Sequence, residues 1–368
     1  MNQKDICDII IENTLKEWSD SMINQNKREI WEIPKYSKSE INKAGSIIAN
    51  LSSTKKERDN ALIILNNWRA SHAYPLQVIC SNLRLNNPNA IVVQRLKRLN
   101  SIISKIERFP NMNLYRMQDL GGCRVIVDTI DQVYEAIDRY KNSNIRHILK
   151  REYNYIQNPK DSGYRSYHMV YQFHSDKKET YNKNMLIEIQ FRTKLQHIWA
   201  TAVEMMGIYT KSNLKSSQGN EDILRFFTLA SSIFAIKENM PICPDTSDDI
   251  HVLVKELIYL NNKHRIISTL SGLKLAVEYT EKKVNNKNIY YVVVLDYSIM
   301  KVHVYDFKSS EFEAATRAYA KIEKLPKKNV VLVSANSFKT LREAYPNYFA
   351  DISGFIQIIR DIFKKYKR

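Results

Sequence analysis

The sequence predicts a mixed α/β fold in which helices flank a sheet, and two kinds of segment indicate it. Short apolar or alternating runs typical of strands occur at Cys123–Val127 and Leu186–Phe191. Segments with helical periodicity, such as Asp131–Tyr140, lie between them. Strands interleaved with helices are typical of a sheet covered by helices, so we expect an α/β core over residues 91–211.

The region before this core, residues 1–90, is expected to be helical. Ser37 is followed three residues later by Glu40, which is the spacing of a capping box at the start of a helix. Apolar residues at helical spacing follow in Ser37–Leu51 and recur in Thr54–Trp68. We therefore expect a helical lead-in that packs on the core.

Three further elements are expected inside the core. In the predicted strand Leu186–Phe191, Glu188 and Gln190 share one face, whereas the other face is apolar. The remaining elements are a basic helix over Val93–Arg108, a strand over Tyr167–Phe173 and a helix over Lys194–Tyr209.

The chain after the core divides into a connector, residues 212–245, and a C-terminal α+β module of unknown role, residues 246–368. The connector is expected to hold a polar loop, Ser212–Gly219, and a helix, Glu221–Glu238. The module is expected to hold a helix over Asp249–Tyr279, a hairpin of Ile289–Tyr297 and Lys301–Phe307 with a Tyr297–Met300 turn, a helix over Phe312–Glu323, a strand over Asn329–Val333 and a basic helix over Ile352–Lys365.

The composition excludes several classes of protein. A chain of 368 residues that is 44% hydrophobic and 26% charged is neither disordered nor collagen-like. No apolar run is long enough to span a membrane, and the start of the chain has no basic-then-apolar leader, so a cytoplasmic protein without a membrane partner is expected. The four cysteines lie far apart without metal-ligand spacing, which favours reduced thiols.

The net charge of +17 indicates a polyanionic partner, either nucleotides or RNA. The alternative, a Lys-rich composition that raises the charge without a function, stays open. Charge alone does not choose between them.

Four segments carry residue types that phosphoryl chemistry on a nucleotide needs. In the first, Lys97, Ser101 and Lys105 are spaced four apart and would share one face of a helix, where they suit a polyphosphate. In the second, Asp119 lies at the entrance to a buried strand and suits Mg²⁺. A solvated basic face and a capping Asp are the alternative interpretations.

The third segment, residues 158–168, is a turn that would present Tyr164 to a nucleobase, with Lys160 and His168 beside it. The fourth begins at Glu188, a carboxylate on a half-apolar strand that a metal ion or a substrate proton would explain. The alternatives are a basic surface turn with a packing tyrosine and a solvated strand face. His197 suits either substrate contact or packing.

Taken together, the order and spacing of these segments resemble a known family. The strings DLGGCRV, PKDSGYRSYH and EIQFRTKLQHIWA begin at Asp119, Pro159 and Glu188. The run from Arg95 to Glu204 resembles the synthetase domain of RelA/SpoT proteins, which include the small alarmone synthetases. No hydrolase motif of the HD type precedes this run, so it resembles the synthetase-only members.

The resemblance implies a nucleotidyltransferase-like sheet and transfer of the β,γ-pyrophosphate of ATP to a ribose 3′-hydroxyl, with Mg²⁺ as cofactor. Two carboxylates, Asp119 and Glu188, would be the catalytic and metal-binding residues, with Glu188 sharing the metal or acting as general base. The ATP site implied by the resemblance comprises Arg95 and Arg124 on the adenine and Lys97, Ser101 and Lys105 on the phosphates. The acceptor site comprises Tyr164 on the base, Lys160 and His168 on the phosphates, and Ser162, Gln190 and Arg192 on the same face.

Three functions stay open on the sequence. The first is synthesis of a (p)ppGpp-type alarmone from GDP or GTP, and the second is a toxin that pyrophosphorylates the 3′-terminal adenosine of tRNA. Guanosine-using members commonly carry Asn where this chain has Ser162, which together with the positive charge favours the second. The third is a non-catalytic RNA-binding or regulatory module. An antitoxin or regulatory protein partner and a homo-oligomer are also open.

Overall fold

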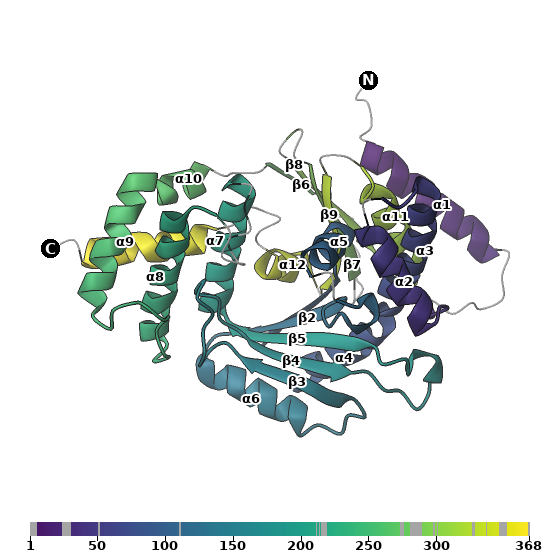
Figure 1. Cartoon of the computed structure of the whole chain (residues 1–368), viewed down its shortest axis with the longest axis horizontal. Coiled ribbons are helices and arrows are strands. Elements are labelled where there is room, and N and C mark those ends of the chain that lie inside the picture. Colours follow the sequence, from purple (N-terminus) through teal and green to yellow (C-terminus); the bar gives the residue numbers. More distant parts are fainter. Residues whose placement is uncertain are drawn as a thin grey trace.

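The computed structural model describes residues 6–23, 31–50, 52–109, 112–210, 212, 214, 219–272, 276–279, 289–296, 299, 301–325, 328–335, 337–345 and 352–366. Within these ranges, one mixed sheet of nine strands has the order β3-β4-β5-β2-β1-β9-β7-β8-β6 (Figure 1). The predicted α/β fold with flanking helices is confirmed. The strands are β1 (Ile91–Leu96), β2 (Gly121–Val127), β3 (Ile148–Asn154), β4 (Tyr167–Gln172), β5 (Leu186–Thr193), β6 (Ala276–Tyr279), β7 (Ile289–Asp296), β8 (Lys301–Phe307) and β9 (Lys328–Ala335).

The described helices are α1 (Ile6–Ile23), α2 (Lys38–Ala49), α3 (Lys55–Ser71), α4 (Ala73–Asn86), α5 (Leu99–Arg108), α6 (Ile130–Lys141), α7 (Lys194–Thr210), α8 (Glu221–Lys237), α9 (Ile250–His264), α10 (Ile266–Gly272), α11 (Phe312–Ile322), α12 (Phe338–Ala344) and α13 (Ser353–Lys365). In Figure 1, α7 to α10 and α13 gather on one side of the sheet and α1 to α3 with α11 on the other, and the remaining described helices lie between these groups. No helix among the described residues combines the length and the apolar character needed to cross a bilayer.

The central strands bring distant parts of the chain together. β2 pairs in parallel with β5, and β1 pairs antiparallel with both β2 and β9. The strands β6 to β9, which belong to the C-terminal part of the chain, therefore extend the same sheet as β1 to β5. The boundaries near residues 90, 211 and 245 stay predictions.

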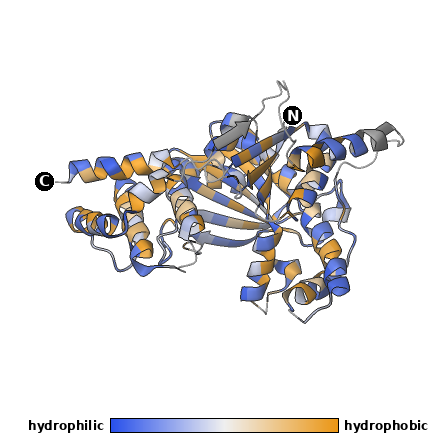
Figure 2. Cartoon of the chain, turned by 90° about the horizontal axis from the view of Figure 1, so that it is seen from above, coloured by the Kyte–Doolittle hydropathy of each residue, from blue (hydrophilic) through white to orange (hydrophobic). Residues whose placement is uncertain are grey.

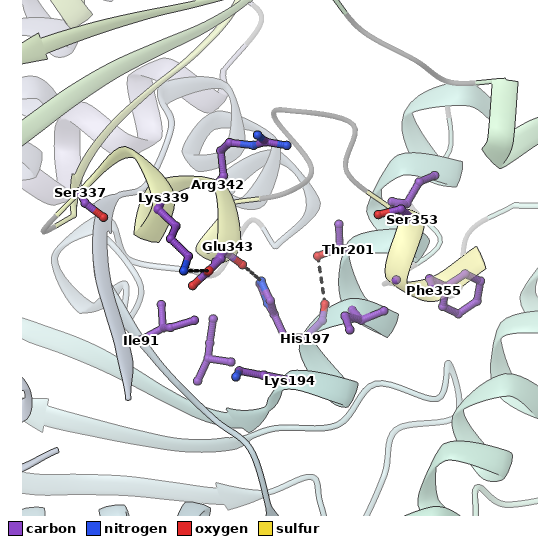
Figure 3. Close-up of a pocket in the computed structure, with 14 residues that line it drawn as sticks. Ile91, Lys194, His197, Thr201, Ser337, Lys339, Arg342, Glu343, Ser353 and Phe355 are labelled. Atoms are coloured by element: carbon purple, nitrogen blue, oxygen red, sulfur yellow. Dashed lines mark hydrogen bonds and ion pairs between the residues drawn. The ribbon is translucent and has the colours of Figure 1, made fainter. Parts of the chain in front are cut away.

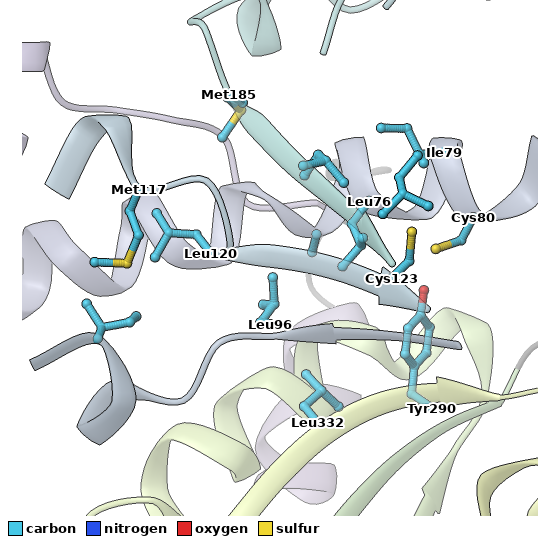
Figure 4. Close-up of a cluster of buried hydrophobic side chains, with 14 of the residues drawn as sticks. Leu76, Ile79, Cys80, Leu96, Met117, Leu120, Cys123, Met185, Tyr290 and Leu332 are labelled. Carbon is cyan, nitrogen blue, oxygen red and sulfur yellow. The ribbon is translucent and has the colours of Figure 1, made fainter. Parts of the chain in front are cut away.

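One face of the sheet is covered by the N-terminal helices and α11. The capping boxes at Ser37 and Thr54 begin α2 and α3, as the sequence predicts for Ser37. Figure 4 shows the apolar core under these helices, where Leu76 and Cys80 of α4 meet Leu96 and Cys123 of the sheet. The cysteines Cys7, Cys80, Cys123 and Cys243 are all free and buried.

A second apolar cluster lies at the opposite end of the molecule, where α7 to α10 pack with α13 (Figure 1). Phe227 of α8 contacts Phe355 of α13 with ring centroids 5.8 Å apart. Figure 2 shows the apolar faces of these helices turned toward one another and their polar faces toward solvent. The last helix of the chain thus packs beside α7, which directly follows the core strand β5.

Most predicted elements of the core and the tail are present, but two predictions are wrong. The predicted helix Val93–Arg108 is a strand up to Leu96, and α5 begins only at Leu99. Val92 and Val93 are 3% and 0% exposed between β2 and β9, and a strand buried on both faces loses the alternation that would reveal it. The predicted helix Asp249–Tyr279 is also wrong, because it divides into α9, α10 and β6.

The break after α9 has a local cause. Arg265 adopts a left-handed backbone with φ of 51°, which ends the helix. The sequence did not predict β3 or α12. The predicted Tyr297–Met300 turn and Ser212–Gly219 loop lie largely outside the described residues.

Candidate active site

Both predicted catalytic carboxylates line one small cavity on the open face of the sheet. Asp119 lies two residues before the start of β2, and Glu188 lies in β5 opposite Gly122 of the neighbouring parallel strand. Because Gly122 has no side chain, the space between the two carboxylates stays open. The residues around this cavity are Arg95, Asp119, Gly122, Cys123, Arg124, Glu188, Gln190 and Tyr345.

Two lysines converge on Asp119. The ammonium of Lys97 lies 2.7 Å from Oδ2 of Asp119, and that of Lys105 lies 2.9 Å from Oδ1. Burial alone would raise the pKa of Asp119, but both lysines outweigh it and lower the pKa to about 2. Burial lowers the pKa of Lys97 despite its acidic partner. Asp119 is therefore ionised at neutral pH between two cations.

The expected helical face that joins Lys97, Ser101 and Lys105 is only partly present. Lys97 precedes α5, whose N-cap is Arg98, whereas Ser101 and Lys105 lie within the helix. Lys97 reaches the site because its backbone N–H bonds the carbonyl of Leu120 at 2.8 Å, which ties it to the start of β2. The two lysines thus meet at Asp119 by tertiary contact.

Glu188 belongs to a polar chain that crosses β4 and β5. His168 Nδ1 lies 3.0 Å from Oε1 of Glu188, and Gln190 donates to Oε2 at 2.7 Å. Arg192 then donates to Oε1 of Gln190 at 2.6 Å. The strand alternation that the sequence predicts is confirmed, since these side chains share one face while Ile187 and its apolar neighbours are buried on the other.

The charge states of Glu188 and His168 depend on contacts within this row of polar side chains. Burial would raise the pKa of Glu188, but His168 outweighs it and lowers the pKa. Burial would lower the pKa of His168, but Tyr164 and Glu188 raise it to about 9. Glu188 is therefore an anion at neutral pH, and His168 is its cationic partner.

Tyr164 lies in the loop before β4, and its hydroxyl points into the polar chain. The hydroxyl contacts His168 Nε2 at 2.9 Å and accepts from Arg192 at 3.1 Å. Burial would raise the pKa of Tyr164, yet Arg192 and His168 lower it to about 7. The ammonium of Lys160 lies 5.6 Å from the Tyr164 ring, so part of this ring faces a cation.

Gly163 positions this loop. Its φ is +83°, and a Cβ there would lie 2.9 Å from Ser231 Cβ and 3.1 Å from the Trp199 ring. The preceding Ser162 is 7% exposed, so it is more buried than a surface turn would leave it. The turn predicted from the sequence is therefore anchored against α7 and α8.

Arg95 and Arg124 line the cavity on the side of β1 and β2. Arg124 donates to the carbonyl of Ala344 at 3.1 Å, and its guanidinium lies 5.8 Å from the centre of the Tyr345 ring. Burial and the nearby Arg192 lower the pKa of Arg124 to about 10. Tyr345 directly follows α12 and was not predicted, because its place in this site depends on the pairing of β9 with β1.

Trp199 and His197, which lie in α7 directly after the strand of Glu188, pack against other elements of the fold. Trp199 donates to the carbonyl of Phe227 at 2.8 Å and is 2% exposed, as expected for a structural side chain. His197 Nε2 lies 3.1 Å from the carbonyl of Glu343 in α12. His197 lines a different cavity from the one that holds the carboxylates.

The site suits Mg²⁺ only with help from a substrate. The described residues contain no group of three or more side chains of the metal-binding types His, Cys, Asp and Glu. Mg²⁺ is commonly held by one or two carboxylates and substrate phosphates, and Asp119 and Glu188 provide that donor set in one cavity. The residues present therefore fit a magnesium ion that arrives with a nucleotide.

The fold and the site together define a class of protein in which a mixed α/β sheet presents two carboxylates and several cations around one cavity. Comparison with protein families narrows the class. Residues 94–214 match the model of the region found in RelA/SpoT proteins, so the resemblance that the sequence predicts is confirmed for this segment.

Two curated relatives come from Bacillus subtilis (strain 168). GTP pyrophosphokinase YjbM is 33% identical over 35% of this chain, and GTP pyrophosphokinase YwaC is 30% identical over 35% of it. The match spans 61% of the length of each relative. Among solved structures, a GTP pyrophosphokinase family protein from Streptococcus pneumoniae is 27% identical, with 50% of this chain and 91% of that chain covered and a TM-score of 0.39.

Proposed function

We propose that this protein is an ATP-dependent pyrophosphokinase that transfers the β,γ-pyrophosphate of ATP to the ribose 3′-hydroxyl of GDP or GTP. The observation that carries the proposal is the meeting of Asp119 and Glu188 in one cavity, with Lys97 and Lys105 beside Asp119. The match to the RelA/SpoT region and the activity in the names of both curated relatives support it.

Each side chain then has a physical task. When ATP binds, Lys97 and Lys105 leave their contacts with Asp119 and bind the phosphates of ATP, whose negative charge they offset. Ser101 adds a hydroxyl donor to the same phosphates. Asp119 and Glu188 would hold Mg²⁺, which supplies further neutralisation of phosphate charge when bound. Arg95 and Arg124 offer planar guanidinium groups to the adenine.

The acceptor lies on the other side of Glu188. Tyr164 and Lys160 offer a ring face and a cation to its base and phosphates, and the cationic His168 lies between them and Glu188. Gln190 and Arg192 keep Glu188 and Tyr164 in place. Glu188, ionised at neutral pH, accepts the proton of the attacking 3′-hydroxyl.

The direct test uses ATP labelled at the γ-phosphate with GDP, GTP or tRNA as acceptor. We expect label on the guanine nucleotide together with release of AMP. The matched variant Glu188→Gln keeps the size and the hydrogen bond to Gln190 but removes the charge, so we expect transfer to fall by at least roughly 100-fold. Full activity in a folded Glu188→Gln protein would contradict the assigned role.

One observation favours the second candidate, a toxin that modifies the 3′-terminal adenosine of tRNA. The rings of Tyr153 and Tyr155 stack with centroids 5.7 Å apart and an interplanar angle of 3°. Lys160 lies 4.4 Å from the centre of the Tyr155 ring, and the Tyr155 and Tyr164 centroids are 6.1 Å apart. Successive aromatic rings beside cations suit consecutive bases of a single strand.

The same assay separates the candidates. Label on tRNA alone would favour the toxin, and Tyr155→Ala should then weaken transfer to tRNA while ATP binding stays unchanged. Label on GDP or GTP alone would leave the alarmone synthetase as the function.

A further inference from the structure

A second cavity, of about 810 Å³, lies on the same face of the sheet as the carboxylate site (Figure 3). Its floor includes Ile91 and Ile126, which pair across β1 and β2, and Ile126 lies two residues beyond Arg124 on the same strand face. Figure 3 shows α12 on one side of the cavity, α13 on the other, and Lys194 and His197 of α7 between them. Pockets of about 300–1,000 Å³ are the size of small-molecule sites.

The inner part of the cavity is apolar. Ile91 and Ile198 are half-buried and offer apolar surface, and the neighbouring Ile126, Ile352 and Phe355 are almost fully buried. Such a lining favours a hydrocarbon or aromatic body, because it offers few partners to a strongly hydrated group.

The polar part of the lining is mainly cationic. Lys194, Lys339 and Arg342 line the cavity, and Glu343 is the single carboxylate among the described residues of the lining. Lys339 lies 4.0 Å from Glu343, and Lys194 forms a 2.6 Å ion pair with Asp128 outside the lining. Among the described residues, the lining therefore holds three cationic side chains and one carboxylate beside its apolar part.

We propose that this cavity binds an amphiphilic anion, a molecule with one apolar body and one phosphate, sulfonate or carboxylate head. The body would lie against Ile91 and Ile198, and the head would face Lys194, Lys339 and Arg342. Apolar burial supplies the affinity, and the cations select the sign of the head group.

A ligand in this cavity would also act on the nucleotide site, because α12 lines this cavity and Tyr345, which directly follows α12, lines the other. Glu343 lines this second cavity, whereas the next two residues, Ala344 and Tyr345, contact Arg124. A ligand that favours one position of α12 changes the affinity for a nucleotide at Arg124, and the nucleotide changes the affinity for the ligand by the same factor. This coupling rests on the proposed function, but binding itself does not.

The test measures binding of 8-anilinonaphthalene-1-sulfonate, an aromatic sulfonate, to the full chain without ATP or acceptor. We expect saturable fluorescence with one site, displaced by decyl phosphate and by decanoate but not by decyltrimethylammonium. Displacement by only one of the two anions would identify the preferred head group. Equal displacement by the cationic amphiphile would overturn the proposal, as would no binding at all.

Gly354→Leu fills the cavity from α13. A Cβ at this position would lie 3.4 Å from Cδ1 of Ile198, which is ordinary contact, so the rest of the leucine side chain has to enter the space. We expect a loss of affinity of at least roughly 10-fold for Gly354→Leu and about 3- to 10-fold for Arg342→Gln. Arg360→Gln on the same helix α13 does not touch the cavity and should bind as the wild type.

Thermal unfolding by circular dichroism checks that each variant is folded. If Gly354→Leu fails to fold, unchanged affinity in Arg342→Gln still overturns the proposal. Because this assay contains no nucleotide, its failure leaves the proposed pyrophosphokinase standing. Loss of transfer activity in the labelled-ATP assay, in turn, leaves the binding result standing.

Discussion

The carboxylate Glu188 and the imidazole His168 show how individual residues acquire their charge state. Neither residue would be charged if burial alone decided, because a low-dielectric interior disfavours both ions. His168 keeps Glu188 charged across a 3.0 Å contact between adjacent strands, and Tyr164 together with Glu188 keeps His168 charged. The reactive carboxylate thus depends on a partner that lies 20 positions away in the sequence.

We expect the imidazole of His168 to titrate near pH 9, against an ordinary value near 6.5. Its pKa should fall part of the way toward the ordinary value in Glu188→Gln, because one of the two groups that raise it is lost while Tyr164 remains. Imidazole resonances followed by NMR measure both values, and His168→Gln assigns the signal. A pKa of His168 that stays unchanged in Glu188→Gln would show that Glu188 is not the cause.

The raised pKa of His168 also predicts how stability depends on pH. The contacts of His168 with Tyr164 and Glu188 stabilise the fold fully below the unfolded pKa near 6.5, and this stabilisation is lost as pH rises through about 9. The difference in unfolding free energy between the wild type and Glu188→Gln should therefore shrink from pH 6 to pH 10, by about 1–3 kcal/mol. Urea unfolding at both values measures it; an equal difference would contradict the assignment.

Helix α12 is the element that links the C-terminal part of the chain to the nucleotide site. It is short, and its position is fixed by Tyr345, whose hydroxyl donates to the carbonyl of Gln94 at 3.1 Å. The Tyr345 ring packs on Arg124, one of the two guanidinium groups that we assign to adenine. In the proposed complex, the adenine of ATP would compete with Tyr345 for Arg124.

Tyr345→Ala should therefore bind ATP more tightly, by several-fold, even though loss of a ring that is 3% exposed lowers the unfolding free energy by about 3 kcal/mol. Titration with a fluorescent ATP analogue measures the first effect and thermal unfolding the second. The matched control is Tyr290→Ala, which removes a ring that is 4% exposed within the core on the other face of the sheet. Weaker ATP binding in Tyr345→Ala, or equal gains in both variants, would contradict the competition.

At the scale of the whole molecule, one buried carboxylate joins three separated parts of the chain. Glu323, which follows α11, accepts from Arg69 of α3 at 2.9 Å and from the backbone N–H of Leu99 at 2.7 Å. Tyr319 donates to the same carboxylate at 2.6 Å. Helix α5, which carries Lys105, therefore has the backbone N–H of its first residue bonded to Glu323, a residue of the C-terminal part of the chain.

Glu323→Ala should lower the unfolding free energy by about 3–5 kcal/mol, because it leaves the buried guanidinium of Arg69 without its carboxylate. The control Glu313→Ala removes an exposed carboxylate of the same helix and should change it by less than about 1 kcal/mol. Urea unfolding followed by circular dichroism and by tryptophan fluorescence should give one shared transition. Two separate transitions, with only one shifted by Glu323→Ala, would show that the C-terminal part folds independently.

The sequence by itself determined the local features of this protein. Capping at Ser37, the alternation around Glu188 and the hairpin of β7 and β8 all arise between near neighbours, so a reader of the sequence finds them. The motifs that carry Asp119, Tyr164 and Glu188 were also readable, because their order and spacing are a property of the chain.

Only the tertiary structure decided what meets across the sheet. The strand β1 was predicted as helix because burial on both faces removes the alternation that marks a strand. The place of Tyr345 beside Arg124, and the contact of Glu323 with Arg69, join residues more than 200 positions apart. Contacts of that range are chosen by the packing of whole elements, and no local pattern of residues encodes them.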